Sequence, residues 1–174
     1  LKATEVDSQE PGAWDICAWV RYRQGRYKDS LALYDKALSL NPYRAIWYNM
    51  RGICYSALND KVRAVVDYTS ALDVDPFLQE AWVNRADARL KLGDLEGALS
   101  DATRIIELAP RYGWGYAKRG EVRAKRRDLI GAEYDFARAV RAATGGRGVD
   151  VAFEVIGLGP TIELSLIHIS EPTR

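Results

Sequence analysis

Few side chains in this sequence could perform catalysis or bind a metal. Among its 174 residues there is one histidine, His168, and two cysteines, Cys17 and Cys54. A lone histidine excludes any site that needs two, and the cysteines lack the C-x-x-C spacing typical of zinc sites. We therefore expect no catalytic residue, no bound metal, no cofactor and no enzymatic activity. We interpret the two cysteines as small apolar side chains that pack in the interior.

A run of basic residues suggests a second kind of chemistry. It could bind an acidic or phosphorylated partner, although Glu121 interrupts it and Asp128 ends it, as on an ordinary solvated helix face. The formal net charge of the chain is only +1, which argues against nucleic acid as a partner. An RNA-binding helical repeat stays open as an alternative. The run consists of Lys118, Arg119, Arg123, Lys125, Arg126 and Arg127.

The elements that must position these residues follow a repeat of 34 residues. Pro42, Pro76 and Pro110 are separated by this interval, and several other positions keep the same chemistry over four periods. A fixed period of this length is typical of a solenoid built from stacked supersecondary units. The matching columns are Trp14, Tyr48, Trp82 and Tyr116; Ala18, Gly52, Ala86 and Gly120; Ser30, Ala64, Ala98 and Ala132; Tyr34, Tyr68, Ala102 and Phe136; and Ala37, Ala71, Ile105 and Ala139.

Each period is predicted to form two helices. Apolar residues fall three and four apart, which places them on one helix face. In the third period the pattern predicts helices over 81–92 and 95–108, with a turn at Gly93 and an end before Pro110. The turn position is Gly25, Asn59 and Arg127 in the other periods, and Arg127 is the weakest helix stop of the four.

These columns resemble the tetratricopeptide repeat family over about residues 11–143. The resemblance implies an all-α, right-handed superhelical array of about four helix-turn-helix repeats, followed by a C-terminal tail that is not part of the repeat. The expected repeats are 11–44, 45–78, 79–112 and 113–143, with 1–10 as the edge of a fragment. One departure recurs: position 7, often Leu in the family, is Cys17, Arg51, Arg85 and Arg119 here.

The resemblance also implies a concave groove, lined by the first helix of each repeat, that binds a peptide or helix of a partner protein. The expected role is that of a scaffold or assembly factor. We expect the aromatic and apolar residues of its first half to grip apolar side chains, although they could instead pack inside the array. The groove candidates are Ile16, Trp19, Tyr22, Arg23, Asn49, Met50, Ile53, Asn84, Asp87, Lys91, Lys118 and Lys125. Of the five tryptophans, Trp14 and Trp82 lie in the aromatic column, whereas Trp19, Trp47 and Trp114 lie outside it, and that position singles them out.

One subclass of the family binds the C-terminal carboxylate of chaperones through a Lys-Asn-Asn-Lys-Arg clamp. The matching positions here are Asp15, Trp19, Met50, Glu80 and Asn84, and none carries the residue that the clamp requires. Two of them are acidic and would repel a carboxylate. We therefore expect no such clamp.

The last thirty residues differ from the repeats. Residues 144–163 resemble a fragment of a medium-chain zinc-type alcohol dehydrogenase, and residues 164–174, LSLIHISEPTR, resemble a translated sequencing adapter. We expect a chimeric join, with fusion to an NAD-dependent dehydrogenase-like domain as the alternative. No helix cap follows the repeats, so we expect Phe136 and Val140 to be partly uncovered. No apolar run is long enough to cross a membrane and no signal peptide is evident, which favours a cytoplasmic location; the oligomeric state is open.

Overall fold

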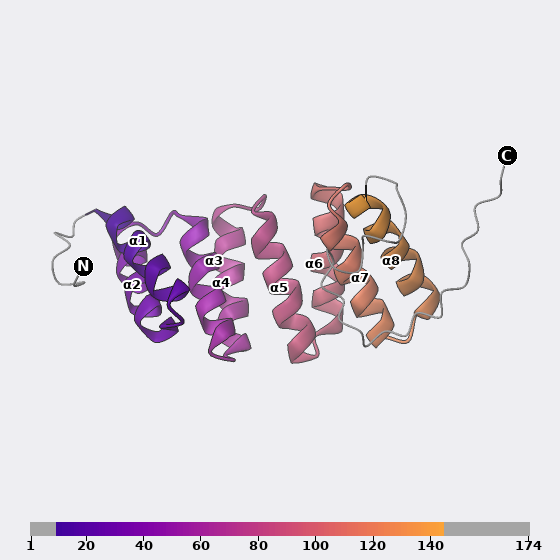
Figure 1. Ribbon diagram of the computed structural model, residues 1–174, viewed down its shortest axis with the longest axis horizontal. Coiled ribbons are helices and arrows are strands. Elements are labelled where there is room, and N and C mark those ends of the chain that lie inside the picture. Colours follow the sequence, from indigo (N-terminus) through magenta and orange to yellow (C-terminus); the bar gives the residue numbers. More distant parts are fainter. Residues whose placement is uncertain (1–9, 145–174) are drawn as a thin grey trace.

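The computed structural model describes residues 10–144, and within that range the chain forms eight α-helices and no strand. The helices follow one another along the length of an elongated molecule (Figure 1). Each helix packs against its neighbours in sequence, so the array has no long-range crossing connection among the described residues. The helices are α1 (Pro11–Arg23), α2 (Tyr27–Leu40), α3 (Ala45–Ala57), α4 (Lys61–Val74), α5 (Gln79–Leu92), α6 (Leu95–Leu108), α7 (Gly113–Lys125) and α8 (Leu129–Thr144).

The turn within each helix pair uses one residue in the left-handed conformation. Gly25, Asn59, Gly93 and Arg127 have φ values of 73°, 64°, 82° and 64°, which confirms the predicted turn positions. Glycine adopts this conformation without a steric penalty, whereas a side chain with a Cβ does so at a cost. Arg127 is therefore the most strained of these turns, in agreement with the sequence pattern.

The residue after the left-handed position starts the second helix in three of the four pairs. Asp60, Asp94 and Asp128 each accept a hydrogen bond from the backbone N–H three residues later, at 2.9–3.0 Å. This bond satisfies one of the amides that the first turn of a helix leaves unpaired. The first pair has Arg26 at this position, without a side-chain cap.

Small residues let the two helices of a pair approach closely. A Cβ placed on Gly52 would lie 2.7 Å from Cε1 of Tyr68, and one on Gly120 would lie 2.9 Å from Cε1 of Phe136. Both aromatic rings therefore pack directly on a glycine backbone. Phe136 is only 6% exposed, so the expectation that it is uncovered is wrong: its ring packs inside the pair formed by α7 and α8. Val140 is half-buried against Tyr116 and Ala139.

The junctions between pairs are filled by compensating side-chain sizes. At the α2–α3 junction Trp47 packs in one core cluster with Ala37, whereas at the α6–α7 junction a Cβ on Gly115 would lie 2.9 Å from Cγ2 of Ile105. A large residue on one helix thus faces a small one on the next, which keeps the interior close-packed. Trp47 is 3% exposed and is therefore a core residue of this junction, although it lies outside the aromatic column.

Several expectations concern residues that the structure does not describe. The dehydrogenase-like segment, the adapter-like segment and His168 lie outside the described residues, as does most of the expected edge at 1–10. Within residues 10–144, none of the helices is both long and apolar enough to span a bilayer.

Candidate functional site

The groove candidates all lie on the first helices of the four pairs, α1, α3, α5 and α7, and we call the accessible side of these helices the first-helix surface. α3 contacts α5 and α5 contacts α7 directly, in addition to the packing within each pair. Side chains at equivalent positions of these helices therefore follow one another from repeat to repeat. This arrangement divides the candidates into an apolar set on α1 and α3 and a polar set on α3, α5 and α7.

The apolar set begins with exposed residues on α1. Ile16 and Trp19 are 67% and 47% exposed, which is unusual for side chains of this size. The Arg23 guanidinium lies 5.3 Å from the Trp19 ring centroid, a distance at which the cation and the ring attract each other. Tyr22 is half-buried and its ring lies 5.8 Å from that of Tyr27. Trp19 is thus the most accessible aromatic residue among the candidates.

Two residues of α3 continue the apolar set. Met50 is half-buried and packs against the core cluster of the first repeat, while Ile53 packs against Tyr68 and Ala88. Both side chains therefore contribute to the interior and also keep a part of their surface accessible. Internal packing, one of the two interpretations that the sequence left open, describes part of what these residues do, and groove contact stays a prediction.

The polar set is connected by hydrogen bonds and ion pairs. Asn84 Nδ2 donates to Asn49 Oδ1 at 3.0 Å, and Asn49 is only 2% exposed, so its role is to orient Asn84. Lys118 Nζ bridges Asp87 Oδ1 and Glu121 Oε2, each at 3.0 Å. Lys91 Nζ binds the second carboxylate oxygen of Asp87 at 2.6 Å, whereas Lys125 is exposed.

Burial and ion pairing shift the pKa values of Asp87 and Lys118 in opposite directions. Burial alone would raise the pKa of Asp87, but the bonds from Lys91 and Lys118 outweigh it and hold the pKa below its ordinary value. Burial would likewise lower the pKa of Lys118, whereas Asp87 and Glu121 raise it. Asp87 and Lys118 are therefore charged at neutral pH, and the ion pairs join them to Lys91 and Glu121, so that two cations lie beside two anions.

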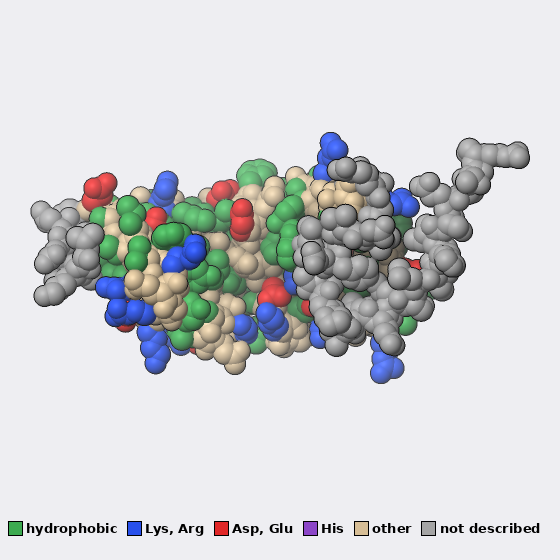
Figure 2. Space-filling model, in the orientation of Figure 1, with side chains coloured by type: hydrophobic (Ala, Val, Ile, Leu, Met, Phe, Trp, Pro, Cys, Tyr) green, Lys and Arg blue, Asp and Glu red, His purple; other side chains and the backbone are tan. Residues whose placement is uncertain are grey.

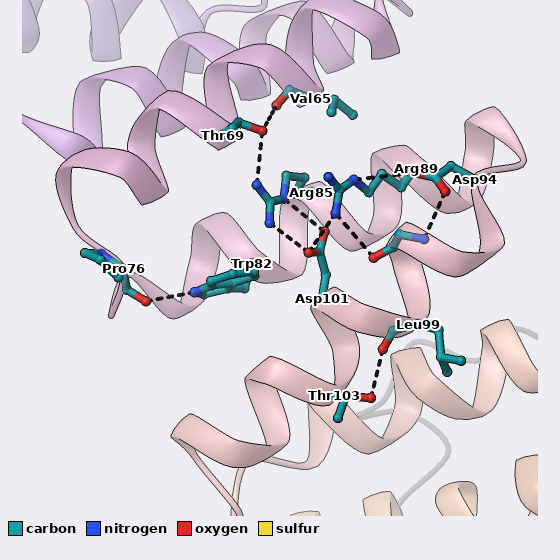
Figure 3. Close-up of polar contacts among 11 residues, drawn as sticks. Val65, Thr69, Pro76, Trp82, Arg85, Arg89, Asp94, Leu99, Asp101 and Thr103 are labelled. Carbon is teal, nitrogen blue, oxygen red and sulfur yellow. Dashed lines mark hydrogen bonds and ion pairs between the residues drawn. The ribbon is translucent and has the colours of Figure 1, made fainter.

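A second network, between the helices of three of the four pairs, was not predicted from the sequence. Arg85 donates from Nε and Nη2 to both oxygens of Asp101 at 3.0 and 2.8 Å, and Arg89 adds a bond of 2.8 Å to the same carboxylate (Figure 3). Asp101 is 1% exposed and Arg85 is 8% exposed. A bidentate pair of this kind is strong and directional. Figure 3 also shows Arg85 reaching Thr69 on α4, in the preceding pair.

The same bidentate pair recurs with the repeat period. Its members are Arg51 with Asp67, Arg85 with Asp101, and Arg119 with Asp135, always sixteen residues apart. The first repeat has Cys17 and Leu33 at these positions, so an apolar pair replaces the ionic one. The arginines at position 7 were visible as a departure from the family pattern. The aspartates recur at the same interval of 34, and that signal could have identified their partners.

Most of the basic run is neutralised by neighbouring carboxylates. Arg119 and Arg123 both bind Asp135, and Arg126 binds Glu96 at 3.1 Å. Together with the bonds of Lys118, this leaves Lys125 and Arg127 as the members without an ion pair among the described residues. The run is therefore not a free cationic patch. On the face seen in Figure 2, cationic, anionic and hydrophobic side chains are interspersed.

The two cysteines pack in or against the core cluster of the first repeats. Cys54 is fully buried and donates to Ser30 Oγ at 3.3 Å; burial raises the pKa of its thiol despite that bond. Cys17 is partly buried. Within residues 10–144 no three His, Cys, Asp or Glu side chains lie together as metal ligands would.

Comparison with known families identifies the repeats. Two models described as tetratricopeptide repeat match residues 11–44 and 57–113, which together are more than half of the chain. Among curated proteins, NPGR2 of Arabidopsis thaliana is 25% identical over 83 residues, or 48% of this chain. That match spans only 11% of the relative, so the similarity concerns the repeats and not the whole protein.

Solved structures share the fold at low sequence identity. The crystal structure of MamA aligns with a TM-score of 0.78 at 15% identity and covers 83% of this chain and 84% of that one. The first TPR of Spaghetti (RPAP3), bound to the HSP90 peptide SRMEEVD, aligns at 0.66 with 24% identity over 70% and 97% of the two chains. YrrB, described as having an unusual peptide-binding site, aligns at 0.72 with 21% identity over 82% and 74%.

Proposed function

The chain belongs to the tetratricopeptide repeat family, and we propose from this that it binds a segment of a partner protein along the first-helix surface. The role is that of an interaction scaffold, without catalysis by the repeats. Relatives that share the fold are described as bound to peptides of HSP90 and HSP70, which supports a protein partner. Because the sequence identity to these relatives is low, the kind of partner must be inferred from the residues of this chain.

The observation that carries the proposal is the exposed apolar set of α1 and α3. Ile16 and Trp19 remain accessible, and Met50 and Ile53 extend the same surface into the second repeat. An apolar partner side chain placed there would lose water from both surfaces, which is the main source of binding energy at such sites. The polar set that follows can then orient the remainder of the peptide through Asn84 and Asp87.

The partner differs from the chaperone tails bound by the relatives. Asp15 and Glu80 occupy clamp positions that would face a C-terminal carboxylate, and neither can attract it. We therefore propose a segment anchored by apolar side chains, with no requirement for a free C-terminus. Peptides ending in EEVD should bind this chain no better than the same peptides with an amidated C-terminus.

The test uses peptides selected from a random library on the full chain. Their affinities are measured by fluorescence anisotropy for the wild type and for Ile53→Ser, with Val66→Ser as the matched control, because Val66 is 59% exposed on α4, outside the first-helix surface. Ile53→Ser should weaken binding at least tenfold, which corresponds to about 1.4 kcal/mol. Equal losses in both variants would contradict the proposal.

Two alternatives remain open as proposals with less support. An RNA-binding role would need free cationic groups, and most of the basic run is paired with acids. A fusion with a dehydrogenase-like domain would depend on residues after 144, which the structure does not describe. Sequencing the source DNA across codons 130–174 without transposon-based library preparation decides between a natural fusion and a chimeric join.

A further inference from the structure

An open pocket of about 250 Å³ lies where the α6–α7 turn meets the C-terminal end of α8. It is separate from the residues of the first-helix surface proposed above. Three of its six described lining residues are arginines and none is acidic. The lining consists of Pro110, Arg111, Tyr116, Arg138, Arg141 and Ala142.

One of these arginines is held in place by a buried tyrosine. Arg138 Nη2 donates to the Tyr116 hydroxyl at 3.1 Å, and the Arg138 guanidinium also lies 5.1 Å from the Tyr116 ring centroid. Tyr116 is only 5% exposed, so its ring is fixed by the packing of α7 and α8. The hydroxyl accepts from Arg138 and retains its own proton to donate to a ligand in the pocket.

The positive charge of the pocket is not offset by nearby acids. Asp135 on α8 is already bound by Arg119 and Arg123, and Glu107 on α6 binds Arg104. Within residues 10–144, neither Arg111 nor Arg141 has a recorded ion pair. Three guanidinium groups thus surround one opening, and no carboxylate is among its described lining residues.

The internal repeat shows that this charge is specific to the fourth repeat. One period earlier, the residues equivalent to Arg111, Arg138 and Arg141 are Phe77, Arg104 and Glu107. There, Arg104 Nη1 binds Glu107 Oε2 at 2.9 Å, so the equivalent pair on α6 neutralises itself. Arginine at position 141 removes that partner from Arg138. Two periods earlier the equivalent residues are Tyr43, Ser70 and Asp73, which carry no positive charge at all.

We propose that this pocket binds a phosphoryl group carried by a serine or threonine side chain of a partner protein. A phosphoryl group has a charge of about −1.5 to −2 and three strong acceptor oxygens, whereas a carboxylate has a single charge. Guanidinium forks match phosphoryl oxygens in bidentate geometry, and the Tyr116 hydroxyl supplies a further donor. A nucleic acid would need cationic groups repeated along its backbone, but the neighbouring Arg119, Arg123 and Arg126 are bound to carboxylates.

The test is a titration of the isotope-labelled full chain, followed through the arginine Nε–H signals at constant ionic strength. The probes are N-acetyl-phosphoserine methylamide, its glutamate analogue and a uridine oligonucleotide. We expect saturable shifts of the Arg111, Arg138 and Arg141 signals, with phosphoserine binding at least tenfold more tightly than glutamate. Arg141→Glu, which recreates the pair found in the third repeat, should weaken phosphoserine binding at least tenfold.

The control is Lys28→Glu, which makes the same change of charge at an exposed residue of α2 and should leave the affinity unchanged. Circular dichroism verifies that both variants are folded. Equal affinity for phosphoserine and glutamate, or equal effects of the two substitutions, would overturn the proposal. Tighter binding of the oligonucleotide with the same sensitivity to Arg141→Glu would overturn it in favour of nucleic acid. None of these outcomes depends on peptide binding at the first-helix surface.

Discussion

Arg127 shows at the scale of one residue how the repeat tolerates an unfavourable side chain. It occupies the left-handed turn position with φ of 64°, where two other repeats use glycine. The position is required because the chain must reverse between α7 and α8 within three residues. Asp128 directly after it caps α8, so the turn keeps its conformation although the residue itself is poorly suited.

Replacing Arg127 by Gly should therefore stabilise the chain. The expected gain is about 0.5–1 kcal/mol, because the relief of strain exceeds the entropy that glycine adds to the unfolded state. Gly25→Ala should have the opposite sign: a Cβ at Gly25 contacts nothing within 4 Å, so only the backbone conformation changes. Urea denaturation followed by circular dichroism measures both, and a loss of stability in Arg127→Gly would contradict the assignment.

Tyr34 and Tyr68 occupy equivalent positions, yet their hydroxyl groups differ. The Tyr34 hydroxyl is buried without a hydrogen-bond partner among the described residues, whereas that of Tyr68 interacts with Ser56. Burial raises the pKa of both phenols, so each is neutral across the physiological range. An unpaired buried hydroxyl costs about 1–3 kcal/mol, whereas a paired one contributes about 1 kcal/mol.

Tyr34→Phe should accordingly leave the free energy of unfolding unchanged or raise it by about 1 kcal/mol, and Tyr68→Phe should lower it by about 1 kcal/mol. Both substitutions remove the same atom from the same repeat position, so each serves as the control of the other. Thermal unfolding of the two variants measures the difference. A larger loss for Tyr34→Phe than for Tyr68→Phe would mean that the Tyr34 hydroxyl is satisfied in solution.

At the scale of the helix pair, a buried ion pair joins the two helices in three repeats and an apolar pair does so in the first. Arg85 and Asp101 lie almost wholly out of water, so the loss of either would leave a buried charge without its partner. The pair also fixes how the two helices sit against each other, since both guanidinium bonds are directional. In the first repeat the uncharged residues Cys17 and Leu33 take these positions, and Cys17 packs against the core cluster that contains Leu33.

Removing one member of the pair should cost more than removing both. Asp101→Leu leaves the Arg85 charge buried, and we expect a loss of about 3 kcal/mol or more. Arg85→Leu combined with Asp101→Leu imitates the first repeat and should recover most of that loss. Asp35→Ala is the control: Asp35 binds Arg51 from an exposed position, and its removal should cost less than about 1 kcal/mol. Additive losses in the double variant would contradict this account.

At the scale of the whole molecule, the periodic positions made the fold predictable from sequence. The prolines recur three times, and the columns of small residues and the turn positions recur four times. All of these features indicate stacked helix pairs. The residues that break the pattern were harder to place. Trp47 lies in a column that has Ala or Gly in the other repeats, and it is buried in one core cluster with Ala37. To predict which two columns contact each other, as those of Arg85 and Asp101 do, one must know the distance between the helices as well as the period.

The candidate surface was predictable to a similar extent. The choice of helix faces followed from the family resemblance, and Trp19 and Ile16 are indeed exposed. The sequence could not separate residues that present a side chain, such as Trp19, from those that support a neighbour, such as Asn49. That distinction depends on burial by adjacent helices, which differs among repeats with the same pattern.

The central claim is that a partner segment lies on the first-helix surface, and Met50 provides the most direct test. It is the single methionine of the chain, so a ¹³C-methyl label on methionine gives one signal, and its half-buried side chain lies within the apolar set. A library-selected peptide should shift that signal saturably, with the same apparent Kd as anisotropy reports. A version of the peptide with its apolar anchors replaced by serine should leave the signal in place. Tight binding by anisotropy that leaves the Met50 signal unmoved would contradict the claim.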